Sequence, residues 1–268
     1  MTVYNTPLKW AGSKVRVMEA LRPLLPKGRR LVEPFMGSGA VFMNTDYDQY
    51  LLADVNDHLI NFYGVITHRT EIFLRLASKM FSESCNEGDY YRARNDFNFG
   101  GDSLTNAVLF LYLNRHCYNG LTRYNNDGKF NTPWGKKEKV YFPEAEIRQF
   151  AEKARKTKAV FICCGFEEAL MMTESGDAVY CDPPYSCTFT KYHTAGFTKE
   201  DQESLVYAIQ SAAGRGCNIT ISNDYTVQSI ALYRGFEQHT ITARRSMSCK
   251  SEGRQSVQEL VATLRAES

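Results

Sequence analysis

The residues Ala178-Val179-Tyr180-Cys181-Asp182-Pro183-Pro184-Tyr185 join a short apolar run to a carboxylate, two prolines and an aromatic ring. The apolar part predicts a buried β-strand, and the prolines mark the turn that ends it. Proline has no backbone N–H, so nothing there competes for two acceptors, the Asp182 side chain and the Pro183 carbonyl. Tyr185 adds a ring on which a flat base can stack. The stretch indicates either a site for the amino group of a nitrogenous base or an ordinary turn after a core strand.

Strand-like runs and helical patterns alternate along both ends of the chain. A helical pattern covers Lys199–Ala213, for example, after the strand at 178–181. Such alternation is typical of an α/β fold with a mostly parallel, doubly wound sheet and helices on both faces. In such sheets ligands bind beyond the carboxyl ends of the strands, which is where Asp182 stands. The other expected strands cover residues 31–34, 50–53, 160–164, 219–222, 236–243 and 260–264.

Two further features follow expected strands. The loop Phe35-Met36-Gly37-Ser38-Gly39 precedes a helix that runs to about Thr45, and Asp54 ends the next strand. Two glycines let a ligand approach the backbone closely, although turn or packing glycines would look the same. Asp54 is well placed to accept hydrogen bonds from ribose hydroxyls. Since the loop lacks the rest of a Gly-x-Gly-x-x-Gly pattern, a nucleoside ligand fits better than a nicotinamide dinucleotide.

The middle of the chain, from about residue 57 to 139, breaks this alternation. Asn56–Leu76 and Leu104–Leu113 have apolar residues at helical spacing. Tyr118–Trp134 is polar and aromatic, with Asn125-Asn126-Asp127-Gly128 as the expected tip of a hairpin. The pattern predicts an inserted, mainly helical domain that carries a β-hairpin.

The formal net charge is only +2, but the charges are unevenly distributed. Residues 9–30 carry seven basic side chains against one acidic, and residues 110–141 carry six against two. A third basic segment lies at residues 244–254. These segments could line one surface for a polyanion, or they could be scattered solvated side chains.

Cysteine and histidine usage predicts neither a disulfide framework nor a metal site. The eight cysteines include no Cys-x-x-Cys pair, and the five histidines are widely spaced. Cys163, Cys164 and Cys181 lie in apolar runs and are expected to be small core residues. The apolar stretches fall far short of the roughly 18 residues needed to span a bilayer. We expect a soluble protein in the reducing cytoplasm, with no metal and no membrane.

Taken in order, these motifs resemble those of the adenine-specific DNA methyltransferases, and closely those of the Dam type. The resemblance runs over nearly the whole chain, and its joint order is more specific than either short motif. It implies a Rossmann-like S-adenosylmethionine-dependent methyltransferase sheet in residues 1–56 and 145–268. Residues 57–144 would form the inserted target-recognition domain. The matching segments are Leu8–Lys14, Val32–Gly39, Ala53-Asp54, Leu113–Asn125, Tyr141–Glu146 and Asp182–Tyr185.

The resemblance makes S-adenosylmethionine the cofactor and the Asp182-Pro183-Pro184-Tyr185 motif the catalytic segment. Asp54 would be the ribose ligand. Residues expected to bind the cofactor or to shape its pocket are Trp10, Lys14, Phe35, Gly37, Gly39, Asp54 and Asp182. Hydrogen bonds from the adenine amino group to Asp182 and the Pro183 carbonyl would favour a tetrahedral, electron-rich nitrogen for direct methyl transfer. A carboxylate of ordinary pKa near 4 is too weak a base to deprotonate that amino group beforehand.

The resemblance also implies double-stranded DNA as the partner, with the target base flipped out of the duplex because a stacked base cannot reach such a pocket. Tyr118 would insert beside the flipped base, Asn119 would contact the backbone, and Arg123 would read a base edge with Leu121 and Pro133. Lys9 would read the first guanine. Further DNA contacts are expected from Arg94, Arg115 and Asn125.

One position departs from the pattern, because Lys137 stands where close relatives carry an aromatic that helps to read the first base. The expected target is adenine in GATC, with its stringency at that base in doubt. No obligate protein partner is predicted. Two alternatives remain: a methyltransferase for RNA adenine or a protein amide, and a catalytically inactive DNA-binding homologue. Asp at position 182 and the long insert weigh against the first alternative, and the intact motifs weigh against the second.

Overall fold

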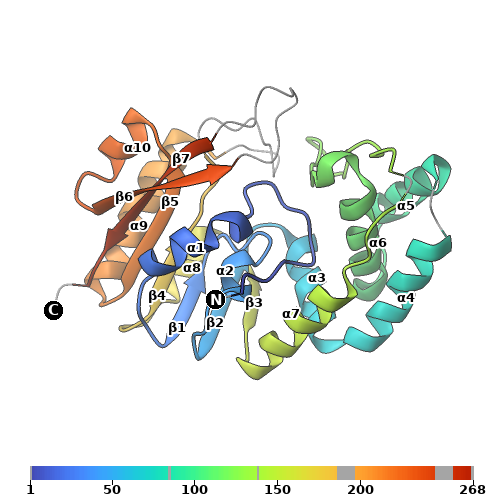
Figure 1. Cartoon of the computed structure of the whole chain (residues 1–268), viewed down its shortest axis with the longest axis horizontal. Coiled ribbons are helices and arrows are strands. Elements are labelled where there is room, and N and C mark those ends of the chain that lie inside the picture. The colour runs from blue at the N-terminus through green and yellow to red at the C-terminus, as the bar shows by residue number, and fades with distance from the viewer. Residues whose placement is uncertain (1, 84–85, 138, 186–196, 245–255, 267–268) are drawn as a thin grey trace.

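The structure is a computed structural model that describes residues 2–83, 86–137, 139–185, 197–244 and 256–266. Seven strands in this part of the chain form one sheet in the order β3-β2-β1-β4-β5-β7-β6 (Figure 1). The first five are parallel, and β7 lies antiparallel between β5 and β6. The α/β, mostly parallel sheet predicted from the sequence is confirmed. The strands are β1 Arg30–Glu33, β2 Gln49–Asp54, β3 Val160–Cys163, β4 Ala178–Cys181, β5 Asn218–Asp224, β6 Glu237–Arg244 and β7 Ser256–Leu264.

Each central strand contributes side chains to two hydrophobic clusters, one on each face of the sheet, because successive side chains point to opposite faces. Leu31 and Tyr180 belong to the cluster on one face, and Val32 and Val179 belong to the cluster on the other. All four side chains are buried. Burial on both faces explains why these strands are continuous apolar runs in the sequence.

Helices cover both faces of the sheet. The cluster that contains Leu31 is completed by η1 Lys14–Val17, α1 Met18–Leu21, α2 Ala40–Met43, α3 Asp57–His68 and α7 Glu144–Lys156. The cluster that contains Val32 is completed by α8 Phe166–Met171, α9 Lys199–Gly214 and α10 Val227–Leu232. A short 3-10 turn, η2 Arg22–Leu24, follows α1. Asn56 and Thr198 cap the first turns of α3 and α9 with side-chain oxygens, which fixes where these helices begin.

The inserted helices α4 Thr70–Glu83, α5 Glu87–Phe99 and α6 Ser103–His116 gather at the end of the molecule far from β6 (Figure 1). The helix expected over 56–76 is two helices, because the chain leaves helical geometry at Arg69. Helix α6 is buried along most of its length, and its residues belong to the same cluster as Leu31. One continuous core therefore joins the inserted helices to the sheet.

The hairpin expected within Tyr118–Trp134 is present as a narrow, irregular pairing. Two isolated antiparallel bridges join Cys117 to Trp134 and Tyr124 to Phe130. A short 3-10 turn, η3 Tyr118–Gly120, lies between Cys117 and Tyr124. Gly128 lies at the tip with a φ of +73°, as expected for an Asp-Gly turn.

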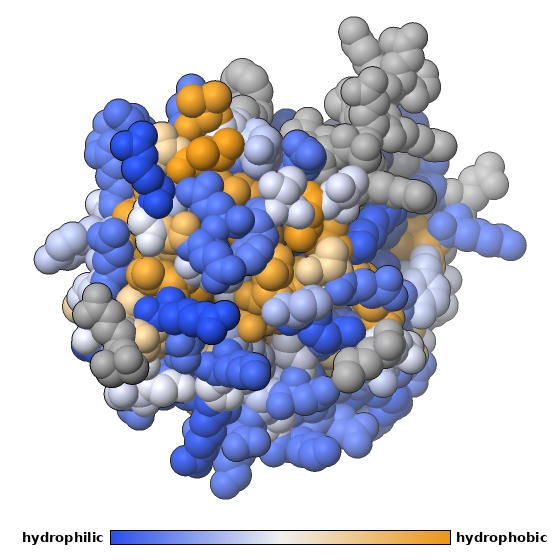
Figure 2. Space-filling view, turned by 60° about the vertical axis from the view of Figure 1, so that its left-hand side comes forward, coloured by the Kyte–Doolittle hydropathy of each residue, from blue (hydrophilic) through white to orange (hydrophobic). Residues whose placement is uncertain are grey.

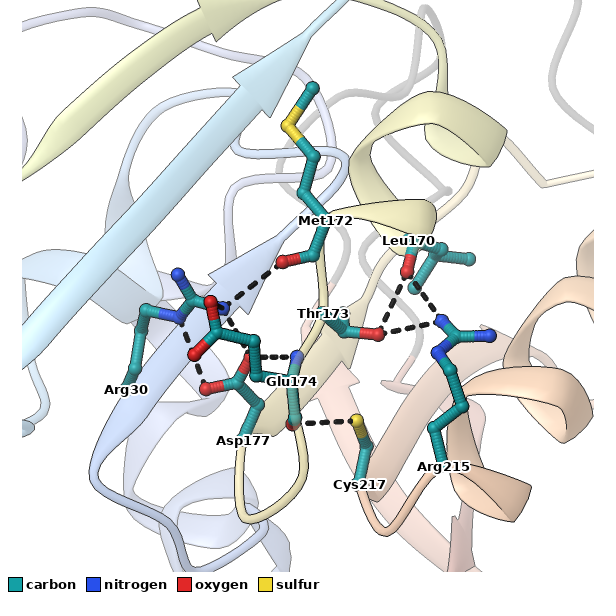
Figure 3. A network of polar contacts seen from close by, with 8 residues as sticks. All are labelled: Arg30, Leu170, Met172, Thr173, Glu174, Asp177, Arg215 and Cys217. Carbon is teal, nitrogen blue, oxygen red and sulfur yellow. Dashed lines mark hydrogen bonds and ion pairs between the residues drawn. The ribbon is translucent and has the colours of Figure 1, made fainter.

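Two arginines fix the turn between α8 and β4 at the amino edge of the sheet (Figure 3). Arg30 forms a two-bonded ion pair with Asp177, with N···O distances of 3.0 and 2.6 Å, and donates to the Met172 carbonyl at 3.0 Å. Arg215 donates to the Leu170 carbonyl at 2.7 Å and the Thr173 hydroxyl at 2.8 Å. These charges have local structural partners, on the opposite edge from Asp182.

The surface that carries the C-terminal strands and helices mixes apolar and hydrophilic side chains, with a largely hydrophilic lower rim (Figure 2). Tyr207 on α9 and Val227 on α10 are exposed. No helix among the described residues has the length and apolar character needed to cross a membrane.

Candidate functional site

Carboxylates collect at the carboxyl edge of the sheet. Glu33 and Asp54 end β1 and β2, and Asp182 follows β4. Strand β7 runs in the opposite direction, yet it brings Glu259 to the same edge because Glu259 pairs with Asp224 at the end of β5. Parallel strands start and end at common edges, so this convergence follows from the topology. Among the described residues, no three His, Cys, Asp or Glu side chains are grouped to hold a metal ion.

A buried ammonium lies among these carboxylates. Lys14 Nζ is 2.8 Å from Asp182 Oδ1 and 3.7 Å from Glu259 Oε2. It also donates to the Tyr185 hydroxyl at 2.8 Å and the Gly12 carbonyl at 3.3 Å. The Lys14 side chain is only 4% exposed, against 19% for Asp182 and 15% for Glu259. An ion pair that is buried from solvent to this extent is weakly screened by water or salt.

Burial shifts the pKa values of Asp182 and Glu259 in the same direction. Burial raises the pKa of Asp182, and the charge of Lys14 and hydrogen bonds from Lys14 and Tyr185 oppose that rise. Burial also raises the pKa of Glu259; Lys14 opposes the rise, and the charge of Asp182 adds to it. Two carboxyl groups thus share one ammonium at the end of β4, the predicted position of the catalytic segment.

The other half of the motif is held from α9. The buried Gln202 side chain donates to the Pro184 carbonyl at 3.2 Å and accepts a bond of the same length from Asn223. Pro183 is buried as well. These contacts tie the end of β4 to α9 and β5, so the direction in which Asp182 leaves the strand is set by three elements.

The glycine loop, Trp10 and Asp54 form a second group at the same edge. Asp54 accepts hydrogen bonds from the backbone N–H groups of Gly37 at 3.1 Å and Asn56 at 3.0 Å. Gly37 has a φ of +46°, and a Cβ there would lie 3.1 Å from the Trp10 indole nitrogen. Gly39 has a φ of +69°, and a Cβ there would lie 2.9 Å from the Phe150 ring. Both positions favour glycine for conformation and space.

The two groups are connected through hydroxyl groups. Ser13, next to Lys14, shares a 2.9 Å hydrogen bond with Ser38 of the glycine loop. The structure therefore brings together Trp10, Lys14, Gly37, Asp54 and Asp182, which the sequence predicted as one site.

Phe35 lies in an aromatic cluster that the sequence did not predict. Its ring stacks on Phe166 with centroids 5.7 Å apart and meets the edge of Phe197 at 5.8 Å. Phe166 begins α8 directly after β3, and Phe197 precedes α9. Position after a strand end was the available signal for Phe166, whereas nothing local marked Phe197 or Glu259.

Glu33 is the most deeply buried carboxyl group at this edge. It is 2% exposed, and its Oε1 atom has no hydrogen-bond partner among the described residues. Burial, followed by the negative charge of Asp182, raises the pKa of Glu33 to about 8, and Lys153 opposes the rise. A neutral carboxylic acid is the form that this environment favours near neutral pH.

Several predicted DNA-binding residues are exposed on the irregular hairpin. Tyr118 is 46% exposed, Asn119 has a positive φ of 53°, and Pro133 is also exposed. Leu121 is half-buried. Arg123 is exposed, and its Nε donates to Asn131 Oδ1 at 2.7 Å, which orients the guanidinium. These side chains share one segment, as expected.

Other predicted DNA-binding residues have internal partners. Arg115 is buried and donates to the Pro7 carbonyl. Lys137 donates to the carbonyls of Arg115 at 2.9 Å and Cys117 at 3.2 Å, at the end of α6. Asn125 accepts from the backbone of the hairpin tip, and Arg94 stacks on the Tyr91 ring. The DNA contacts of these four residues, like those of Lys9 and of the residues on the hairpin, stay predictions.

Lys9 links the hairpin to the N-terminal segment. Its backbone N–H donates to the Asn114 side chain at 2.9 Å, and its carbonyl accepts from the same amide at 2.7 Å. A Cβ at Gly120 would lie 2.5 Å from the Lys9 Cβ, so the turn after Tyr118 packs directly on this residue. Burial, followed by the charge of Lys9, lowers the pKa of Lys137 to about 8.

Comparison with known proteins covers nearly the whole chain. The family model for D12 class N6 adenine-specific DNA methyltransferases matches residues 10–247. The retron Ec67 DNA adenine methylase of Escherichia coli is 47% identical over 260 residues, covering 96% of this chain and 90% of that protein. The DNA adenine methylase of Serratia marcescens is 44% identical and covers 96% of this chain and 97% of its own. That of Escherichia coli strain K12 is 42% identical, with coverages of 95% and 93%.

Proposed function

Because the chain belongs to the D12 class of N6 adenine-specific DNA methyltransferases, we propose that it methylates adenine in GATC, with S-adenosylmethionine as the methyl donor. The observation that carries the proposal is the Asp182–Lys14–Tyr185 cluster at the carboxyl edge of the sheet. The cluster supports the proposal because Lys14 bonds both to the Asp182 carboxylate, the predicted acceptor, and to the Tyr185 hydroxyl, whose ring is the predicted stacking partner. Relatives with DNA adenine methylase names support the reaction, and GATC rests on the resemblance of the hairpin segment.

The residues at the carboxyl edge fit S-adenosylmethionine. Gly37 has no side chain beside Trp10, so a ligand could approach its backbone, and two backbone N–H groups orient the Asp54 carboxylate at the end of β2. The acidic edge also suits a ligand that carries a sulfonium and an ammonium group. When bound, the cofactor supplies an electrophilic methyl group. The residues that would hold it are Trp10, Lys14, Phe35, Gly37, Gly39, Asp54 and Asp182.

Asp182 and the Pro183 carbonyl would accept hydrogen bonds from the adenine amino group and orient its lone pair. Lys14 holds the Asp182 carboxylate in place, and the Tyr185 hydroxyl bonded to Lys14 fixes the ring that would stack on the base. Orientation and transition-state stabilisation are thus the contributions of these residues. The Asp182 carboxylate is too weak a base to deprotonate a neutral amino group. The proton therefore leaves only after the nitrogen has become cationic.

We propose that the target adenine is flipped out of the duplex, with residues 57–144 as the target-recognition domain. Unstacking a base costs a few kcal/mol, which Tyr118 insertion and Tyr185 stacking would offset. Exposure of Tyr118, Asn119 and Arg123 on one segment supports this arrangement. Lys137 Nζ donates to two backbone carbonyls at the end of α6, so we expect first-base readout to depend mainly on Lys9.

The test is transfer of labelled methyl from S-adenosylmethionine to duplexes that contain GATC or a single-base change of it. We expect labelling of the GATC duplex alone, with the label recovered as N6-methyladenine. Equal labelling of all duplexes would remove the GATC assignment. RNA and protein acceptors in the same assay test the alternative substrates. A fluorescent base analogue at the target position would report flipping as an increase in emission on binding.

We also propose a cytoplasmic location, because the relatives are bacterial DNA methylases and their substrate lies in that compartment. The relatives' activity on DNA supports double-stranded DNA as the partner.

A further inference from the structure

Glu259 is a charged residue of the site that no sequence motif marks. It lies on β7 and reaches the carboxyl edge only because β7 is antiparallel to β5. Its Oε2 atom is 3.7 Å from Lys14 Nζ, and its side chain is 15% exposed. Lys14 and Tyr185 are the groups whose hydrogen bonds favour the ionised form of the Glu259 carboxyl group, as they do for Asp182.

The charges of this cluster do not balance. Lys14 provides one positive charge, while Asp182 and Glu259 provide two carboxyl groups. Asp182 and Lys14 alone would form a neutral pair with little net field on a nearby cation. When Glu259 is ionised as well, the three side chains carry one excess negative charge. Burial disfavours the ionised form of Glu259, so a nearby cation would be stabilising. Such a site stabilises a cation strongly because its charges are already oriented and poorly screened.

The methyl-transfer reaction places a cation at this position. The bond between the methyl carbon and sulfur breaks with its electron pair left on sulfur, and the adenine N6 lone pair forms the new C–N bond. Positive charge therefore moves from the sulfonium to N6. The cationic nitrogen then loses one proton, which Asp182 can accept and release to water. Negative charge near N6 lowers the energy of this charge as it develops.

We propose that Glu259 is a charge-balancing residue of the methyl-transfer site: it shares Lys14 with Asp182 and so leaves the net negative charge that stabilises the cationic N6 centre. Glu259 acts through Lys14 and Asp182 and need not touch the substrate. The inference rests on the proposed mechanism, in which Asp182 accepts the adenine amino group.

The test compares Glu259→Gln, which keeps shape and removes charge, with Glu259→Asp, which keeps charge and shortens the side chain. Glu237→Gln on the neighbouring β6 is the matched control, because it removes an exposed carboxylate from the same sheet. Single-turnover methylation of a GATC duplex is measured at saturating DNA and cofactor. We expect Glu259→Gln to slow transfer by about tenfold or more, as loss of one poorly screened charge implies.

The charge role predicts that Glu259→Asp stays closer to the wild-type rate than Glu259→Gln does, and that Glu237→Gln is unchanged. A role in shape alone predicts the reverse order, with Gln tolerated and Asp impaired. That reverse order, or a wild-type rate in Glu259→Gln, overturns the proposal. Thermal unfolding and GATC duplex binding of each variant show whether the fold and the DNA surface are intact.

A second readout needs no turnover. Calorimetry gives the affinities of each variant for S-adenosylmethionine, which is cationic at sulfur, and for S-adenosylhomocysteine, which is neutral there. We expect Glu259→Gln to weaken the cationic ligand more than the neutral one, and Glu237→Gln to affect neither. Equal effects on both ligands would contradict the charge role. Failure of the wild type to methylate GATC would instead count against the proposed target, leaving this comparison valid.

Discussion

Lys14 and Asp182 lie 2.8 Å apart, at the junction of η1 and the end of β4, and each depends on the other. A buried ammonium without its carboxylate, or the reverse, costs several kcal/mol. Tyr185 and Glu259 are the other polar partners of Lys14 in this buried site. At the scale of single residues the site is therefore a coupled unit, and removal of one member changes the others.

We expect Asp182→Ala to reduce methyl transfer by roughly a thousandfold, because both the acceptor for the amino group and the partner of Lys14 are lost. Duplex binding should survive, since the hairpin residues lie on another segment. Labelled methyl incorporation measures the first effect and fluorescence anisotropy the second. Retained turnover in this variant would discard the proposed role of Asp182.

Glu33→Gln should stabilise the fold, and more so as pH rises. The pKa of folded Glu33 is about 8, above its ordinary value of 4.5. The folded state therefore binds the proton more tightly, and the stability from this group, complete below about pH 4.5, is lost as pH rises through 8. Gln does not titrate. The advantage of Gln in unfolding free energy should grow between pH 5 and pH 8 by on the order of 3–4 kcal/mol, because a shift of one pKa unit corresponds to about 1.4 kcal/mol.

Denaturant unfolding at both pH values measures this difference. Glu152→Gln, on the exposed face of α7, is the matched control and should show no change with pH. If the Glu33→Gln advantage were the same at pH 5 and pH 8, Glu33 would not be the buried acid described above.

At the scale of elements, backbone hydrogen bonds within the segment after α6 fix its backbone, so that several of its side chains point to solvent. Tyr118 N–H donates to the Pro133 carbonyl at 2.9 Å, and Asn131 N–H donates to the Arg123 carbonyl at 3.0 Å. Lys137 caps the end of α6, where the helix dipole favours a positive charge. This segment needs no regular strands to hold Arg123 in one orientation.

Arg123→Ala should relax discrimination at one base pair of the recognition sequence by about 1–3 kcal/mol, the value of a two-bonded contact to a base. Asn131→Ala should have a smaller effect of the same kind, because it frees the guanidinium without removing it. Methylation rates on the set of singly substituted GATC duplexes measure both. An unchanged site preference in Arg123→Ala would refute the assignment.

At the scale of the whole molecule, the inserted helices and the sheet share one hydrophobic core. Phe110 on α6 is buried and packs near Phe62 and Phe97, with ring centroids 6.0 and 6.1 Å apart. The N-terminal segment crosses the same junction: Pro7 and Lys9 bond to α6, and Lys14 bonds to Asp182. The five peptide bonds between Lys9 and Lys14 therefore connect the contacts with α6 to the contact with Asp182, in addition to the shared core.

Phe110→Ala should therefore destabilise the whole chain, by about 3–5 kcal/mol, and not the insert alone. The chain has two tryptophans, Trp10 near the glycine loop and Trp134 in the hairpin. Trp10→Phe leaves Trp134 as the one tryptophan, a reporter for the hairpin, and Trp134→Phe leaves Trp10, a reporter for the glycine-loop region. In denaturant both reporters should move to the same lower midpoint. A shift of the Trp134 transition alone would show that residues 57–144 unfold independently.

Local patterns were sufficient for much of the architecture. Strand β4 is predicted with its observed bounds, and α9 with its observed start, because buried strands and capped helices have short-range signals. The two-helix break at Arg69 was missed, since both helices continue one apolar periodicity. Cys163 was expected in the core and is exposed, because β3 is an edge strand, and strand order is not a local property.

By itself the sequence determined the α/β class, the family, and the positions of Asp54 and Asp182 at strand ends, because these depend on periodicity and on contiguous motifs. Only the tertiary structure decided that Glu259 shares Lys14, that Phe166 and Phe197 pack on Phe35, and that Arg115 and Lys137 have internal partners. Such contacts join residues far apart in the chain. They depend on strand order, strand direction and burial, which neighbouring residues do not encode.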